Sequence, residues 1–313
     1  MVRFMPPLLR KTDSAMKIFA KGWSTSKDGP GHRRIYYLKG CDLRCLWCAS
    51  PESINFKDDL LFYPARADEN DLKFLCPVNA ISGQILNRSI CRNCTAQPCR
   101  SLRHRAMEWV GCEISVDDIV NDLLDAKNNW SGFSGVTFGG GEVSLQSREL
   151  LPLLKILRRH NIHSTIESNA HCISFPDLVL ETDMVITDLK CGTADTFLRY
   201  TSGNFDSVRK NHRFAAEFAR SLIIRVPLIP SVNDTRQEIE AMTAILHSLN
   251  HIRLDAVGET LQVEILKLHH FGAAKYAALD LPYQAADFPI PSDEALIRLE
   301  NIFTETGLSV IRS

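Results

Sequence analysis

The chain has 313 residues, 45% of them hydrophobic and 23% charged, which is typical of a globular protein of one large domain or one and a half and excludes wholesale disorder. Its 36 basic and 37 acidic residues leave a net charge of −1, so the whole chain offers no electrostatic case for nucleic acid or an anionic membrane. The apolar N-terminal stretch 4–9 is too short for a signal peptide or a membrane span. We therefore expect a cytoplasmic protein.

The first predicted elements lead into a cysteine loop. Residues 1–33 are expected to be irregular and contain the turn sequence Asp-Gly-Pro-Gly. The β-rich run 34–38 predicts a strand. The next segment reads Gly-Cys-Asp-Leu-Arg-Cys-Leu-Trp-Cys and places Cys41, Cys45 and Cys48 just after that strand. The C-terminal end of a parallel strand is where α/β barrels carry their chemistry.

The spacing of these three cysteines indicates a metal centre. Thiolates separated by three and two residues can converge on one centre when the segment forms a tight loop. A [4Fe-4S] cube has four irons, so three cysteines leave one iron open to a ligand that is not protein. A structural zinc site normally closes with four protein ligands. We favour the cluster; a zinc knuckle with a distant fourth ligand, or three unrelated buried thiols, are the alternatives.

Residues 53–111 differ in texture from the rest, with weak periodicity and few long apolar runs. They predict a small inserted domain, which needs a bound metal group to stabilise its fold because it has so few core residues. Four thiolates on an auxiliary [4Fe-4S] cluster or on zinc would supply it, from Cys76, Cys91, Cys94 and Cys99. The Cys-Pro step, and Cys-x2-Cys followed by a further cysteine, are similar to bacterial ferredoxins, although x4 stands where ferredoxins have x2. A zinc ribbon is the alternative.

Regular alternation of helices and strands begins at residue 112. Apolar periodicity and end signals predict helices near 116–124, 150–157, 207–220, 234–249 and 292–306. Asp234 is expected to cap the fourth of these helices and Gly307 to follow the last. The predicted strands are 34–38, 135–138, 162–166, 183–189, 221–227, 261–266 and 308–312. Three cysteines lack cluster spacing and are expected to be buried thiols: Cys112, Cys172 and Cys191.

Six strands followed mostly by helices, with one terminal strand, predict parallel βα units. Six units fall short of the eight of a closed barrel, so we expect an α/β fold, a partial (β/α)6 TIM-like barrel. Residues 1–52, which include the cysteine loop, and residues 112–313 would form this barrel around the ferredoxin-like insert at 53–111. A doubly wound sheet is the alternative.

The quoted motifs resemble those of a known family. Cys-x3-Cys-x2-Cys after a first strand, with Gly-Gly-Glu at 140–142 after the second, resembles the radical S-adenosylmethionine (SAM) enzymes. The Asp-Gly-Pro-Gly sequence before the first strand, Ser-Pro-Glu-Ser at 50–53 and the position of the insert are similar to the activating enzymes of glycyl radical enzymes, such as pyruvate formate-lyase activating enzyme. This resemblance implies a [4Fe-4S] cluster whose open iron is chelated by the amino and carboxylate groups of SAM.

The resemblance also implies how SAM is held. Gly140, Gly141 and Glu142 match the loop that binds its amino group, and an ammonium does need acceptors. Trp47 matches the aromatic position that packs on the adenine. Lys190, in the Asp-Leu-Lys motif at the end of a strand, could meet the carboxylate of SAM.

Further implied contacts lie on later strand ends. Asp188 would face a ribose or a small cation, and Glu167 with Ser168 stand where many activating enzymes have Asp-Thr, beside an implied monovalent cation site. Arg225 matches an arginine before a proline-containing loop. An unpaired arginine in so apolar a strand is costly, so either SAM or a structural carboxylate should meet it. His269 matches the family's His-x-x-Gly element and is a candidate SAM contact.

The implied function is that of a radical SAM oxidoreductase that activates a glycyl radical enzyme. Such an activase cleaves SAM reductively to methionine and a 5′-deoxyadenosyl radical, which abstracts a hydrogen from a backbone glycine of the partner. A low-potential reductant such as flavodoxin or ferredoxin is a second implied partner, and we expect a monomer without nucleic acid or membrane. One alternative keeps the radical SAM core but acts on a small molecule, a peptide or RNA. The non-enzymatic alternative is a zinc-binding scaffold.

Overall fold

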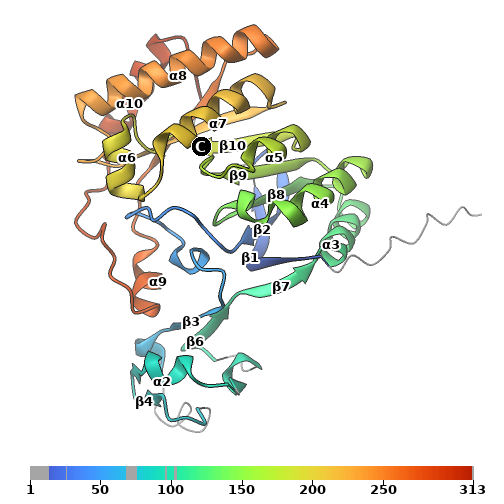
Figure 1. The fold of residues 1–313 in the computed structure, drawn as a ribbon, viewed down its shortest axis with the longest axis vertical. Coiled ribbons are helices and arrows are strands. Elements are labelled where there is room, and N and C mark those ends of the chain that lie inside the picture. Colours follow the sequence, from blue (N-terminus) through green and yellow to red (C-terminus); the bar gives the residue numbers. More distant parts are fainter. Residues whose placement is uncertain (1–13, 26, 68–75, 96, 102–103, 312–313) are drawn as a thin grey trace, which may run out of the picture.

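The structure, a computed structural model, describes residues 14–25, 27–67, 76–95, 97–101 and 104–311. Its centre is a nine-stranded sheet in the order β13-β12-β11-β10-β9-β8-β2-β1-β7 (Figure 1). The parallel strands are β2 (His32–Leu38), β8 (Phe133–Gly140), β9 (Ser164–Ser168), β10 (Met184–Asp188), β11 (Leu222–Leu228), β12 (Gln262–Lys267) and β13 (Ser309–Ile311). The predicted series of six βα strands and one terminal strand is confirmed.

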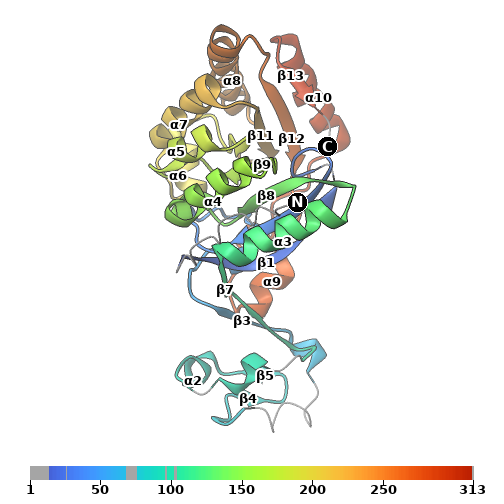
Figure 2. The same ribbon diagram turned by 90° about the vertical axis from the view of Figure 1, so that its right-hand side faces the viewer.

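The helices accompany the sheet in one continuous row (Figures 1 and 2). Neighbours in this row pack against each other in the order α3, α4, α5, α7, α8, α10. Their bounds are α3 (Val116–Asn129), α4 (Ser147–Arg159), α5 (Phe175–Glu181), α7 (Phe205–Phe218), α8 (Arg236–Val257) and α10 (Asp293–Glu305), with α6 (Ala194–Thr201) beside α7. A doubly wound sheet would divide its helices between two faces. The single row instead fits the predicted partial TIM-like barrel.

Two antiparallel strands extend the sheet beyond the predicted series. The expectation that residues 1–33 are irregular is wrong for the described part of that range, because β1 (Ala15–Thr25) pairs with β2. On its other edge β1 pairs with β7 (Cys112–Ser115), which follows the insert. Met16 and Ile18 of β1 are buried in the main core. These strands therefore join the two chain segments that flank the insert.

Helix ends follow local side-chain chemistry. Ser115 caps α3 by accepting a hydrogen bond from the backbone N–H of Asp118, at 3.0 Å. The prediction that Asp234 caps α8 is wrong: Thr235 holds that position and accepts from Glu238 N at 3.3 Å. Asp234 instead accepts from the backbone of Ser231 in the preceding turn. In the described part of the chain, no helix is long and apolar enough to cross a membrane.

The cysteine-rich segment projects from the barrel (Figures 1 and 2). Its strands β3 (Asp59–Phe62) and β6 (Met107–Val110) pair antiparallel and form its stem. Beyond them lie the small pair β4 (Ile81–Ser82) and β5 (Ile85–Leu86) and the short helix α2 (Arg88–Arg92). A separate small core of buried residues fills this region, and three of the cysteines pack against it. This segment thus folds around its own apolar centre.

The short helix α9 (Ala273–Ala278) touches both the barrel and the projecting segment. At its start, a Cβ on Gly272 would lie 2.8 Å from the carbonyl oxygen of Cys48, so the two backbones are in close contact. At its end, Arg88 of α2 donates to the carbonyl oxygens of Ala278 and, at 3.0 Å, of Leu60. Leu279 packs with the stem in a further small core. One turn and a half of helix therefore connects the cysteine loop to the insert.

Replacement of Gly141 by Ala tests the close approach of the loop after β8 to the cysteine loop. An added Cβ would lie 2.2 Å from the carbonyl oxygen of Gly40, which is backbone and cannot move aside cheaply. We expect a loss of about 1–3 kcal/mol in unfolding free energy, seen as a lower thermal midpoint. Gly22→Ala is the matched control, because nothing lies within 4 Å of its added Cβ. Equal midpoints for the two variants would contradict this packing.

Candidate functional site

One cavity opens at the C-terminal ends of the parallel strands. Its wall contains the three cysteines of the first loop together with residues from the ends of β8, β9, β10, β11 and β12. Of the side chains implied by the family resemblance, those that line it are Cys41, Cys45, Cys48, Trp47, Gly140, Gly141, Glu167, Ser168, Asp188, Lys190, Arg225 and His269. Residues spread over 229 positions of sequence therefore meet at one place.

Backbone hydrogen bonds hold the cysteine loop in position. Arg44 N donates to the carbonyl of Thr201 at 2.7 Å, and Leu46 N donates to that of Tyr200 at 3.0 Å, both at the end of α6. Cys41 N donates to the carbonyl of Ile54 at 3.0 Å. The loop is thus fixed by a later part of the barrel and by the segment that follows it. This support leaves the thiols facing the cavity.

The three thiols occupy an environment that favours their neutral form when no metal is bound. Burial raises the pKa of Cys41 to about 12 and that of Cys45 to about 12, although Lys190 opposes the rise at Cys45. Burial also raises the pKa of Cys48, which accepts from Ser50 N at 3.4 Å. A metal centre binds thiolates and displaces their protons. The loop therefore supplies three shielded sulfurs in an arrangement suited to a metal cluster.

The described residues do not form a compact binding group for a single ion. Nowhere among them do three His, Cys, Asp or Glu side chains converge closely enough to hold one metal ion. A zinc site would draw its sulfurs to about 2.3 Å from one ion. The cysteines of the first loop instead lie along the wall of a cavity. The lining contains these three thiols and no fourth cysteine, whereas a structural zinc site normally closes with four protein ligands.

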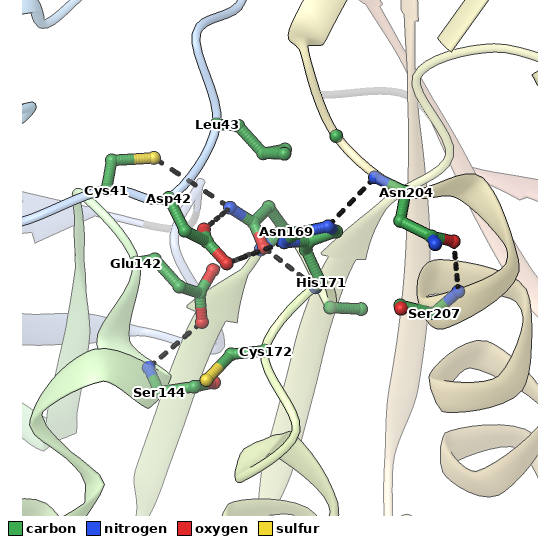
Figure 3. A network of polar contacts seen from close by, with 12 residues as sticks. Cys41, Asp42, Leu43, Glu142, Ser144, Asn169, His171, Cys172, Asn204 and Ser207 are labelled. Carbon is green, nitrogen blue, oxygen red and sulfur yellow. Dashed lines mark hydrogen bonds and ion pairs between the residues drawn. The ribbon is translucent and has the colours of Figure 1, made fainter. Parts of the chain in front are cut away.

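A polar network ties the cysteine loop to β9 and to the start of α7 (Figure 3). Asp42 accepts from Asn169 Nδ2 at 3.0 Å and contacts His171 Nδ1 at 2.7 Å. The other ring nitrogen of His171 accepts from Asn204 N at 2.9 Å. Because a backbone N–H can only donate, this bond assigns the proton of a neutral ring to Nδ1, facing Asp42. Asn169 Nδ2 also lies 3.8 Å from Cys41 Sγ.

Glu142 is fully buried and does not line the cavity. Its carboxylate accepts from Ser144 N at 2.9 Å, from Ser168 Oγ at 2.7 Å and from Asn169 N at 2.7 Å. Burial raises its pKa, while these hydrogen bonds oppose the rise. In this structure Glu142 therefore binds neighbouring protein groups and joins the loop after β8 to the end of β9 (Figure 3).

Lys190 provides a shielded cation beside the thiols. Its ammonium lies 2.5 Å from Asp188 Oδ2, and its side chain is 12% exposed. Burial alone would lower the pKa of Lys190, but Asp188 and the thiolate form of Cys45 outweigh it, so the pKa is raised. The lysine therefore stays charged at neutral pH and can attract an anionic ligand group.

Arg225 meets structural carboxylates, one of the two partners considered from the sequence. Its guanidinium lies 2.6 Å from Glu167 Oε1 and 2.5 Å from Glu264 Oε2, and it donates to the carbonyl of Lys27. Burial raises the pKa of Glu167 to about 7, although Arg225 opposes the rise. The wall formed by β9, β11 and β12 thus carries a largely buried charge network.

The four cysteines of the insert line one second cavity, which is otherwise mainly apolar. Cys76 accepts from Ala80 N at 3.1 Å, and Cys99 accepts from Trp109 Nε1 at 3.4 Å. Burial raises the pKa of Cys91, and the neighbouring Cys99 adds to the rise. Four sulfurs around one apolar cavity, two of them with N–H donors, fit the environment of an iron–sulfur cluster.

Some positions differ from the sequence expectations or were not foreseen. Cys112 is exposed and Cys172 is only partly buried, so the expectation of buried thiols is wrong for both, whereas Cys191 is buried as expected. Asp42 and His171 were not predicted as site residues. A polar residue next to the first cysteine was the available signal for Asp42. His171 carried no motif, because its role depends on a contact with Asn204 across the fold.

Replacement of Arg225 by Met would leave Glu167 without its cation. We expect a loss of about 3–5 kcal/mol in unfolding free energy at about pH 8. Because the pKa of Glu167 is raised to about 7, its ionisation costs stability as pH rises toward and through that value. The loss should therefore be smaller at about pH 6, where more of the carboxyl is neutral. Anaerobic urea unfolding measures both values.

Arg236→Met is the matched control for that variant. Its partner is Glu240 at 2.7 Å, but the two side chains are 91% and 63% exposed. We expect loss of this exposed, solvent-screened pair to leave the unfolding midpoint in urea unchanged at both pH values. Similar losses for the two arginine variants would show that the Arg225 pair is screened like a surface pair.

The sequence of this chain is similar to those of several known proteins. The model of the Radical SAM superfamily matches residues 35–243. The (2S)-3-sulfopropanediol dehydratase activating enzyme of Klebsiella oxytoca is 31% identical, over 83% of this chain and 84% of the relative. The 4-hydroxyphenylacetate decarboxylase activating enzyme of Clostridioides difficile is 29% identical, over 90% of this chain and 91% of that protein.

Solved structures agree in fold. Streptococcus suis SuiB bound to S-adenosylmethionine superposes with a TM-score of 0.52 at 15% identity, covering 89% of this chain and 49% of that chain. A radical SAM methyltransferase from Sphaerobacter thermophilus gives 0.50 at 14% identity, covering 97% of this chain and 76% of its own. At these identities the likeness concerns the fold alone.

Proposed function

The chain belongs to the radical SAM superfamily, among the activating enzymes of glycyl radical enzymes, and we propose that the cavity at its strand ends holds a [4Fe-4S] cluster together with SAM. The protein is an oxidoreductase that cleaves SAM reductively and abstracts a hydrogen from a backbone glycine of a glycyl radical enzyme. The bound cluster and SAM supply one electron and a 5′-deoxyadenosyl radical to this reaction.

The observation that carries the assignment is the number of thiols in the cavity. All ten cysteines are described, and only Cys41, Cys45 and Cys48 line it. A cube of four irons bound there would keep one iron without a cysteine ligand, which is the position that SAM needs. Asn169 and Ser50 add N–H donors to two of these sulfurs.

Other residues that line the cavity would each bind a different part of SAM. Lys190 is placed to attract its carboxylate, and Trp47, which is 8% exposed, to pack on its adenine. Gly140 and Gly141 bring backbone acceptors to its amino group. Glu142 would hold these glycines in position, because its carboxylate accepts hydrogen bonds from Ser168 and Asn169 and does not face the cavity.

Charged and polar groups on later strands complete the proposed binding wall. Asp188 faces the ribose or a monovalent cation, in a role supported by its position beside Lys190. Glu167 and Ser168 line the same wall, and Arg225 keeps Glu167 oriented through their ion pair. His269 stacks on Phe271 with 4.3 Å between ring centroids at the edge of the cavity, where it could contact SAM.

We further propose that residues 53–111 form a ferredoxin-like unit with one auxiliary [4Fe-4S] cluster on Cys76, Cys91, Cys94 and Cys99. Their common cavity and the separate small core support this assignment. A flavodoxin or ferredoxin as reductant belongs to the same proposal. A cytoplasmic location belongs to the same proposal, because ten cysteines, most of them grouped as cluster ligands, suit a compartment that keeps thiols reduced; the monomeric state stays a prediction.

The relatives do not favour the alternative of a small-molecule, peptide or RNA substrate. The activating enzymes among them cover most of this chain and are covered in turn over most of their own length. Activation of a protein partner is therefore the function that we carry forward.

The two cysteine groups should differ in their effect on SAM cleavage. With dithionite as reductant, Cys45→Ala should abolish 5′-deoxyadenosine formation, because the cluster beside SAM loses a ligand. Cys94→Ala is the matched control: it should keep SAM binding but lower stability or partner activation. Chromatographic detection of 5′-deoxyadenosine gives the first result, and equilibrium dialysis of SAM gives the second.

Two outcomes would contradict the assignment. Intact SAM cleavage by Cys45→Ala would place the reactive cluster elsewhere. Zinc at about two ions per chain with no iron or sulfide, in anaerobically purified protein, would replace both clusters by zinc sites.

A further inference from the structure

His171 lies at the centre of a hydrogen-bonded chain that runs from the start of α7 to the cysteine loop (Figure 3). It follows β9, and its side chain is 21% exposed, as is that of Asp42. Asp42 comes directly after Cys41, the first cysteine of the loop. The imidazole therefore connects a residue beside a proposed cluster ligand to a distant part of the barrel.

The direction of each hydrogen bond in this chain is set by its first donor. The Asn204 N–H can only donate to the ring, so a neutral His171 carries its proton on Nδ1 and donates it to Asp42 Oδ2, at 2.7 Å. The other carboxylate oxygen of Asp42 accepts from Asn169 Nδ2 at 3.0 Å. Asn169 Oδ1 accepts from the backbone N–H of His171 at 2.8 Å. The amide of Asn169 is therefore held in one orientation.

This orientation turns the amide nitrogen of Asn169 toward the first cysteine. Asn169 Nδ2 lies 3.8 Å from Cys41 Sγ. With the amide reversed, its carbonyl oxygen would face both this sulfur and the Asp42 carboxylate, and neither group can donate when it is ionised. Asn169 is only 8% exposed, so water competes little for its amide. The side chain thus offers Cys41 a shielded hydrogen-bond donor.

Hydrogen bonds to the sulfurs and nearby charges are two of the factors that set the reduction potential of an iron–sulfur cluster. Reduction adds one negative charge to the cluster. An N–H donor at a ligand sulfur stabilises this charge, whereas a bare carboxylate nearby opposes it. His171 affects both factors, because it donates to the Asp42 carboxylate and, through Asp42, keeps Asn169 in place. Loss of the imidazole would therefore make the cluster harder to reduce.

We propose that His171 is a positioning residue that raises the reduction potential of the cluster held by Cys41, Cys45 and Cys48. It acts through Asp42 and does not itself line the SAM cavity. The inference rests on the proposed function, because it concerns the cluster which that function requires. In the affected equilibrium one electron passes from a reductant, which is dithionite in the test below, to the cluster. No bond forms or breaks in this step.

Replacement of His171 by Phe tests the proposal without a measurement of activity. The holoenzyme and the variant are titrated anaerobically with dithionite in the absence of SAM, and reduction is followed by electron paramagnetic resonance. The signal that changes when SAM is added to a parallel sample identifies the cluster of the cysteine loop. We expect its one-electron reduction equilibrium to fall at least about threefold in the variant, a shift of about 28 mV to more negative potential.

The route through Asp42 is tested by the same replacement in an Asp42→Leu background. Leucine accepts no hydrogen bond from the imidazole or from Asn169. His171→Phe should then change the reduction equilibrium by less than about 1.5-fold, because a residue that acts through Asp42 has no effect once Asp42 is absent. The double variant also places two apolar side chains against each other, so neither is left as a polar group without a partner.

Three further variants give the scale of the effect. His171→Gln keeps one donor and one acceptor, and its reduction equilibrium should stay within about twofold of that of the unchanged protein. His247→Phe replaces an exposed histidine of α8 and should do the same. If His171→Phe does not assemble the cluster of the loop, His171→Leu makes the same deletion with a smaller side chain and should show the same loss of at least about threefold.

Several results would overturn the positioning role. They are an unchanged or more positive potential in the apolar variants of His171, an equal shift in the Asp42→Leu background, or an equal shift in His247→Phe. A lower iron content with an unchanged potential would reduce His171 to a structural residue and overturn the proposal as well.

The proposed function is judged by a separate measurement. SAM cleavage by the unchanged holoenzyme with dithionite does not depend on any variant of His171. If this cleavage occurs while the potential of His171→Phe is unchanged, only the positioning role is wrong. If the cluster of the loop is reduced by dithionite but SAM is not cleaved, the proposed function fails.

Discussion

The cysteine loop keeps its geometry only because distant parts of the chain hold its backbone. The end of α6 accepts two of its N–H groups, and Ile54 accepts a third. His171 adds a bridge from Asp42 to the backbone of Asn204. A loop so short could not bury three thiols at one cavity wall by itself, since its own backbone groups would be left without partners. The reactive centre is therefore a product of the whole barrel.

The same loop is fixed at both of its ends by buried charge. Lys39 is fully buried, and its ammonium contacts the carbonyl of Glu52 at 2.5 Å and Asp59 Oδ2 at 3.1 Å. Asp59 opens β3, the first strand of the insert's stem. Lys275 of α9 pairs with the Glu52 carboxylate at 2.5 Å. Since a buried charge is costly to leave unpaired, any displacement of the stem would also disturb the segment beside the first cysteines.

Local sequence patterns were sufficient to predict the parallel strands, because each strand is a short apolar run between turn residues. They were also sufficient to predict the three metal-ligating cysteines of the first loop, because the spacing of these residues can be read directly from the sequence. They were insufficient to predict β1, whose apolar and polar residues alternate only weakly and which forms a strand by pairing with β2 and β7.

The cap of α8 was misplaced by one residue because Asp234 and Thr235 are both good caps. Glu142 matched a motif, yet its contacts with Ser168 and Asn169 depend on how β8 and β9 align. His171 had no pattern at all, since its value arises from a contact across the fold.

Radical transfer to a protein partner is the central claim, and electron paramagnetic resonance of the complete system tests it most directly. The anaerobic holoenzyme, SAM and a reductant are mixed with the glycyl radical enzyme of the same organism. The account predicts the doublet of a glycyl radical on the partner, together with 5′-deoxyadenosine. Formation of 5′-deoxyadenosine without any doublet on the partner would contradict the activation of that enzyme.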